Sequence, residues 1–129
     1  MEQKDREMIE KILDSGSIAY AYIYPRGGSA RQEFMISATP ENIANFLGSH
    51  FYDSEKMIIT DIADRLILDT FGGFINSCPD QRLCREIVPI LAPIQQGDEP
   101  GEIIGVSREV ADQYFFEEDQ KVTMAEMMM

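Results

Sequence analysis

The chain has 129 residues, which is enough for one domain that folds around its own core without disulfides or a metal ion. Its 23 acidic residues outnumber 11 basic ones, and the formal net charge of −12 disfavours direct binding to nucleic acid or to an anionic membrane. Such a charge favours solubility, or a partner protein with a basic surface.

The cysteines and the N-terminus indicate where the protein works. Cys78 and Cys84 form no disulfide framework, and no His or Cys pair nearby would complete a zinc site, so we expect both thiols to be reduced. The N-terminal segment MEQKDREMIEK is charged throughout, unlike a signal peptide. No apolar run reaches the roughly 18 residues of a membrane span. We therefore expect a cytoplasmic protein that needs no cofactor.

The first half of the chain predicts a helix, a β-hairpin and a second helix. The signals are the helical spacing of apolar residues, the alternation of large side chains and a Thr-Pro helix start. The predicted elements are a helix over Glu2–Ser15, strands over Ile18–Tyr24 and Ala30–Ala38, and a helix that starts at Thr39 and ends at Gly48.

Three tyrosines, Tyr20, Tyr22 and Tyr24, share one face of the first predicted strand because side chains alternate along a strand. This face either packs against a helix or forms an exposed aromatic contact surface, since tyrosine is enriched in protein interfaces.

The second half of the chain predicts a central pair of strands followed by two helices. The expected elements are strands over Met57–Ile62 and Leu66–Phe71, a helix opening at Ser77–Asp80, a short strand over Glu102–Val106, and a last helix capped by Ser107. The nearly continuous apolar run Leu66–Phe71 predicts a strand buried on both faces. Pro89 and Pro93 predict that the third helix ends or kinks near Val88.

Together these elements predict an α+β fold: a single domain over residues 1–120, with a mainly antiparallel sheet of about four to five strands and helices packed on one side. Residues 121–129 form a methionine-rich C-terminal tail that we expect to fray or to dock on a partner chain.

Few residues suggest catalysis, and we expect a protein that is not an enzyme. The carboxylates Asp61 and Asp69 would meet in a magnesium site if the two central strands pair as a hairpin, whereas Asp64 fits a turn. His50 is the sole histidine, and nothing near it in the sequence supports a Cys–His pair. We predict no bound metal.

The last helix carries the strongest electrostatic signal in the chain. Closely spaced carboxylates can imitate a phosphate backbone and occupy a basic nucleic-acid-binding groove. The carboxylates concerned are Glu109, Asp112, Glu117, Glu118 and Asp119.

The chain resembles small proteins carried by phages and conjugative elements of Gram-positive bacteria. The resemblance rests on the size and acidity of the chain and on two blocks, YAYIYPRGGSARQEF and ITDIADRLILDTFGGFINSCPDQRLCREIVPILAP. Acidic single-domain members of that set are often anti-CRISPR or antirestriction inhibitors. The resemblance implies stoichiometric blocking of a host defence nuclease, such as a CRISPR effector or a restriction enzyme.

Three functions remain open from the sequence. The first is a non-catalytic inhibitor that covers a basic nucleic-acid-binding site with its acidic surface. The second is a homodimeric structural or regulatory interaction module that uses the tyrosine face or the last helix. The third is a small metal-dependent hydrolase with Asp61 and Asp69 as ligands.

Overall fold

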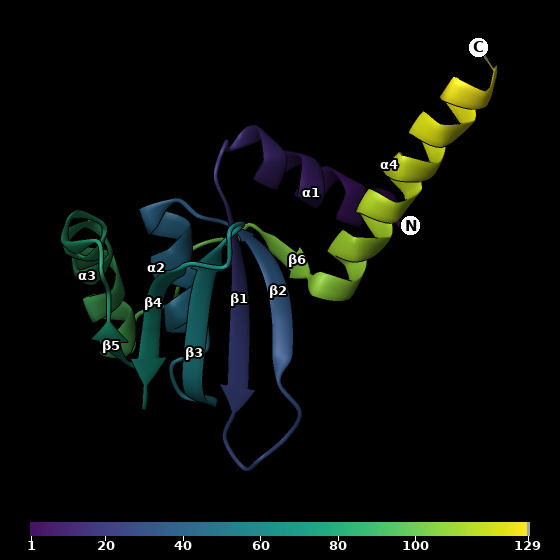
Figure 1. Ribbon diagram of the computed structural model, residues 1–129. Coiled ribbons are helices and arrows are strands. Elements are labelled where there is room, and N and C mark those ends of the chain that lie inside the picture. The colour runs from purple at the N-terminus through teal and green to yellow at the C-terminus, as the bar shows by residue number, and fades with distance from the viewer. Residues whose placement is uncertain (129) are drawn as a thin grey trace.

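Six antiparallel strands form one sheet in the order β5-β4-β3-β1-β2-β6 in a computed structural model that describes residues 1–128, with side chains described through Lys121 (Figure 1). The strands are β1 Ile18–Pro25, β2 Gln32–Ser37, β3 Ser54–Asp61, β4 Leu66–Phe71, β5 Phe74–Ser77 and β6 Gly105–Ser107. The helices are α1 Gln3–Asp14, α2 Pro40–Ser49, α3 Gln81–Gln95 and α4 Arg108–Met128. The expected α+β class is confirmed, with one or two strands more than predicted.

The main core lies between one face of the sheet and helices α2 and α3. Strand β1 supplies Ala19, Ala21 and Ile23, each at most 1% exposed, because every second side chain points to this face. The helices and the neighbouring strands contribute most of the other buried side chains: Ile36, Ile43, Phe46, Leu47, Met57, Ile59, Leu68, Ile87 and Leu91.

A second, smaller core lies on the opposite face at the β2–β6 end of the sheet. Helices α1 and α4 pack there, and their contacts bury Ile9, Ile12, Met35, Val106 and Ala111. The expected placement of helices on one side therefore describes α2 and α3, whereas α1 and α4 cover part of the other face. The reason lies in β2, where the adjacent apolar residues Met35 and Ile36 are both fully buried and point to opposite faces.

Two predicted helix ends differ from the structure, whereas the alternative of a kink near Val88 stays a prediction. Helix α2 continues through Gly48 to Ser49, so this glycine is not the helix end. Helix α3 runs through Pro89 and Pro93 to Gln95. Both prolines are exposed, as is Arg85, so the carbonyls that lose their helical hydrogen bonds can bind water. The helix itself begins after the cap residue Asp80, whose carboxylate accepts hydrogen bonds from the amides of Arg82 and Leu83.

The strand β4 is not buried on both faces. Leu68 and Thr70 point into the main core, but Leu66 is 39% and Phe71 is 65% exposed, because no helix covers the opposite face here. The Gly72-Gly73 pair forms a turn into β5, a strand that the sequence did not predict. Because α1 and α4 contact this face of the sheet only at the β2–β6 end, most of the face that carries Tyr22 and Tyr24 is open.

Helix α4 extends away from the sheet and carries the C-terminal end of the chain outward (Figure 1). Its backbone is helical through Met128, into the predicted methionine-rich tail. The side chains of residues 122–129 lie outside the part of the chain that the structure describes, so the expected fraying or docking of this tail stays a prediction.

Candidate protein-binding surfaces

The three tyrosines share one face of the sheet, as their alternation predicted. Tyr20 pairs with Met35 on β2 and Thr60 on β3, and it lies at the end of the sheet that α1 and α4 cover. Tyr22 and Tyr24 lie further along β1, beyond the helices. The structure thus divides the face: Tyr20 packs against a helix, whereas Tyr22 and Tyr24 border open space.

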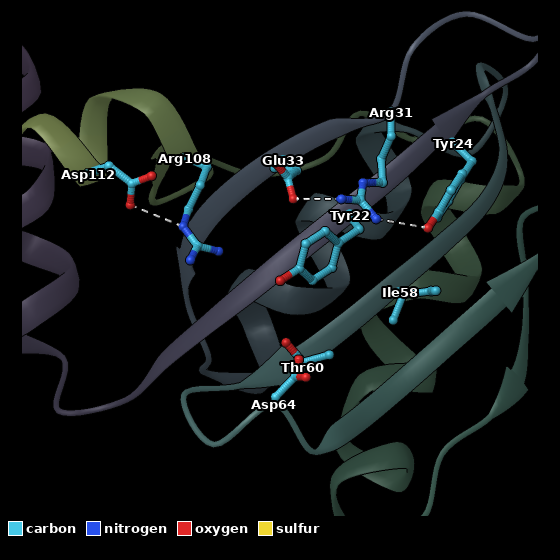
Figure 2. A pocket seen from close by; sticks show the side chains of 9 residues that line it. All are labelled: Tyr22, Tyr24, Arg31, Glu33, Ile58, Thr60, Asp64, Arg108 and Asp112. Carbon is cyan, nitrogen blue, oxygen red and sulfur yellow. Dashed lines mark hydrogen bonds and ion pairs between the residues drawn. The ribbon is translucent and has the colours of Figure 1, made fainter.

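A groove of about 450 Å³ crosses this open face between two arginine side chains (Figure 2). Its lining residues come from β1, β2, β3, the β3–β4 turn and the start of α4. They are Tyr22, Tyr24, Arg31, Glu33, Ile58, Thr60, Asp64, Arg108 and Asp112. A groove of this size with aromatic and arginine side chains has the composition of a binding surface.

Arg31 is held at one end of the groove by aromatic and acidic neighbours. Its terminal nitrogens donate to the Tyr24 hydroxyl at 3.3 Å and to the Glu33 carboxylate at 3.1 Å. Its guanidinium carbon lies 5.1 Å from the centre of the Tyr22 ring. The hydrogen bond with Tyr24, followed by the charge of Glu33, raises the pKa of Arg31 above its ordinary value despite some desolvation. The side chain is therefore a fixed cation.

Arg108 occupies the other end, at the first residue of α4. Its guanidinium carbon lies 4.1 Å from the centre of the Tyr20 ring, and its Nε donates to Asp112 at 3.2 Å. Burial alone would lower the pKa of Arg108, but hydrogen bonds with Asp112 and Tyr22 outweigh it and the net pKa is raised. Asp112 thus holds an arginine in place and is already paired, which the sequence did not reveal.

The other acidic residues of α4 divide into paired and unpaired groups. Arg6 on α1 donates to Glu117 at 3.0 Å and to Glu118 at 3.2 Å, and these contacts join two helices that are far apart in the sequence. Glu109 and Asp119 are exposed, and neither contacts a cation among the described side chains. Of the five predicted carboxylates, these two are the ones free to meet a partner.

Helix α1 adds an acidic stripe that the sequence analysis did not single out. Glu7, Glu10 and Asp14 are all exposed, and their spacing of three and four residues places them along one side of the helix. No described cation forms an ion pair with any of the three. The spacing of these three acidic residues is visible in the sequence and would have been enough to predict the stripe. We call the free carboxylates of both helices the acidic surface: Glu7, Glu10, Asp14, Glu109 and Asp119.

The predicted magnesium ligands are not brought together. Asp69 lies opposite Ile58 on β3, and Asp61 lies three residues further along that strand, about 10 Å away at the usual rise per residue. Asp61 accepts hydrogen bonds from the amides of Ala63 and Arg65, and these hydrogen bonds lower its pKa. Among the side chains described, those of residues 1–121, no cluster of three or more His, Cys, Asp or Glu has the geometry to hold a metal ion.

The remaining reactive side chains occupy structural positions. His50 packs against Phe46 with 4.9 Å between ring centres, and its Nδ1 lies 3.5 Å from Asp53. Cys78 and Cys84 are free thiols, as expected, at the start of α3. Burial, together with the neighbouring Cys84, raises the pKa of Cys78 to about 11, so this thiol stays protonated near neutral pH.

Comparisons of the chain with protein-family models, with curated proteins and with solved structures give no match. Among the described residues, no helix combines the length and the apolar content that a membrane crossing requires.

Proposed function

We propose that this protein is a non-catalytic binding protein that covers a basic surface of a partner protein with its acidic surface. The observation that carries the proposal is the arrangement of α1 and α4. Arg6 ties the two helices together at 3.0 and 3.2 Å, while five exposed carboxylates on them face no described cation. With a net charge of −12, such a surface attracts a cationic partner and repels nucleic acid.

Binding rather than catalysis is supported by the positions of the reactive groups. Asp61 and Asp69 each have a local partner, Arg65 and Asn76, and lie well apart on the sheet. The raised pKa of Cys78 makes its thiol a poor nucleophile. No described constellation joins a nucleophile to a base.

The proposed partner is a nuclease of a host defence system, acting in the cytoplasm. A nucleic-acid-binding groove is lined with Lys and Arg that normally contact phosphates, and the exposed carboxylates of α1 and α4 can meet the same cations. A CRISPR effector or a restriction enzyme is the class that the sequence resemblance implies. The protein would inhibit by occupying the groove in place of the substrate.

The test is inhibition of DNA cleavage by purified CRISPR effectors and restriction enzymes over a series of salt concentrations. We expect the inhibition constant of the double variant Glu109→Lys with Asp119→Lys to rise at least tenfold, because two attractive contacts become repulsive. Glu117 and Glu118 are unsuitable positions, since their substitution would also release Arg6.

The matched control is Glu55→Lys with Glu86→Lys, which changes the net charge equally at two exposed positions on β3 and α3. We expect the control to inhibit within about threefold of the unmodified chain. Equal loss in both variants would show that net charge alone acts, and the absence of inhibition across the enzymes would overturn the proposal.

A further inference from the structure

Two neighbouring rows of side chains cross the open face of the sheet, and their charges are opposite. The register of β1 with β3 and of β3 with β4 aligns Tyr24, Lys56 and Phe71 in one row, and Arg31 extends this row over the Tyr24 ring. We call this set the positive row, because Arg31 and Lys56 are its charged members. Lys56 Nζ lies 5.9 Å from the centre of the Tyr24 ring.

The adjacent row carries the reverse charge. Tyr22 pairs with Glu33 on β2 and with Ile58 on β3, and Ile58 pairs with Asp69 on β4. We call these four residues the negative row. Residues two apart on a strand lie about 6.6 Å apart on the same face, so the two rows are parallel and separated by that distance.

The face between these rows is open and has an apolar component. Phe71 is 65% exposed, and the side chains of Tyr22, Tyr24 and Ile58 are partly exposed in the groove. Helices α1 and α4 cover the Tyr20 end of this face. Arg108 and Asp112 in the first turn of α4 reach the negative row, and the positive row has no helix over it. A sheet face of this kind is normally covered by a second layer.

We propose that a second copy of this chain covers the open face, with its own open face turned toward the first. A two-fold axis that runs across the strands, midway between the two rows, places the positive row of each copy on the negative row of the other. Arg31, which pairs with Glu33 of its own chain at 3.1 Å, then also lies opposite Glu33 of the second copy. Tyr24 lies opposite Tyr22 of the second copy. Lys56 becomes a diagonal neighbour of Asp69 of the second copy.

The row order itself selects this arrangement. An axis parallel to the strands would place each row on the same row of the second copy, so neither row would meet the row of opposite charge. With that axis over β1, Arg31 would face Lys56 of the second copy and the two cations would repel. The axis across the strands makes the contact isologous, so every opposite-charge pair occurs twice. It also keeps the strands of the two sheets aligned, as in common sheet-on-sheet packing.

A single strand of nucleic acid is a poorer occupant, although tyrosines on a sheet can stack bases. The negative row would repel its phosphates, and the net charge of −12 opposes the approach of any polyanion. A second copy brings the same net charge, but its rows present opposite charges at contact distance, and salt screens the longer-range repulsion. This inference is independent of the proposed inhibition, because the acidic surface does not take part in the contact.

Sedimentation velocity over a range of protein concentrations tests the proposal. We expect a dimer of the unmodified chain at tens of micromolar, and monomers for two variants: Arg31→Glu with Lys56→Glu, and Glu33→Lys with Asp69→Lys. The first variant has two negative rows and the second has two positive rows, so neither can pair with itself. An equimolar mixture of the two variants should form a heterodimer.

The mixture shows whether a variant is monomeric because it has lost contacts or because it has misfolded, since a misfolded variant could not restore association. Lys4→Glu with Arg82→Glu, at two exposed positions away from the face, gives the charge change of the first variant and should leave the dimer intact. A monomer of the unmodified chain up to about 1 mM would overturn the proposal. So would row variants that still dimerise, or a mixture of the two that stays monomeric.

Discussion

Gly48 shows how one residue can have two opposite effects on stability. It lies inside α2, where replacing glycine by alanine normally stabilises a helix by up to about 1 kcal/mol. A Cβ atom at this position, however, would collide with the side chain of Ile94 on α3, which is only 7% exposed. The sequence indicated a helix end at Gly48, because a glycine near the end of a helical pattern usually has that role.

For Gly48→Ala we predict that the collision outweighs the gain in helix propensity. The free energy of unfolding should fall by about 1–3 kcal/mol, the usual cost of overpacking a core, measured by urea denaturation. Ile94→Ala supplies the control background, since it removes Cγ2 and Cδ1, two of the three Ile94 atoms that the new Cβ meets. In that background Gly48→Ala should be neutral or stabilising, and an unchanged penalty would contradict the assigned cause.

At the scale of elements, the buried side chain of Asn42 joins α2 to the segment that leads into β6. Its Nδ2 donates to the main-chain oxygens of Ser37 at 2.7 Å and Ile104 at 2.9 Å, and its Oδ1 accepts from the Ile104 amide at 2.7 Å. Only 3% of Asn42 is exposed. This one amide supplies three hydrogen bonds to main-chain groups, and the Ile104 oxygen also accepts from the Ser37 amide at 3.0 Å.

We predict that Asn42→Ala lowers the free energy of unfolding by about 3 kcal/mol, because three hydrogen bonds are lost at about 1 kcal/mol each and the partly buried Ile104 amide loses its acceptor. Amide hydrogen exchange of Ile104 should accelerate more than that of the β1 core amides. The matched change Asn76→Ala removes a single exposed contact of 3.3 Å and should cost less than about 0.5 kcal/mol. Equal costs for the two variants would refute this role for Asn42.

The elements that the sequence predicted correctly are those with local signals. The Thr39 cap, the alternation along β1 and the Ser107 cap act within a few residues, and the structure contains each of them. Strand β5 has four residues, too few to display a period. The path of α3 through Pro89 depends on which side of the helix meets water, and that is decided by distant elements.

In the molecule as a whole, the candidate sites also contain features with a local sequence signal and features that depend on residues far apart in the chain. Alternation placed Tyr20, Tyr22 and Tyr24 on one face from the sequence alone, whereas the pairing of Tyr22 with Glu33 on β2 came from the structure. The division of the α4 carboxylates into paired and free groups was not predictable, because the cation that pairs Glu117 lies 111 residues earlier in the chain. Charge counts along a sequence locate acidic segments, but only the folded arrangement shows which carboxylates have a cation.

The contact between α1 and α4 joins the first and the last helix of the chain. Arg6 reaches Glu117 and Glu118 with separate nitrogens, and its guanidinium carbon lies 5.6 Å from the centre of the Tyr114 ring. Its side chain is 24% exposed, so salt screens the interaction only in part. Among the described residues, α1 and α4 make few other contacts with each other, and this fork therefore ties α4 to α1.

For Arg6→Gln we predict a loss of about 1 kcal/mol in the free energy of unfolding, since the pairs are partly exposed and two carboxylates lose their cation. Hydrogen exchange should accelerate in α4 beyond Tyr114 and stay unchanged in β1 and β3. Arg6→Lys retains the charge but not the fork, and should recover only part of the protection because one ammonium group cannot hold both carboxylates in the same geometry. Raising the salt concentration should narrow the difference between Arg6→Gln and the unmodified chain. Protection of α4 that is unchanged in Arg6→Gln would mean that apolar packing by Ala111 and Tyr114 alone fixes the helix.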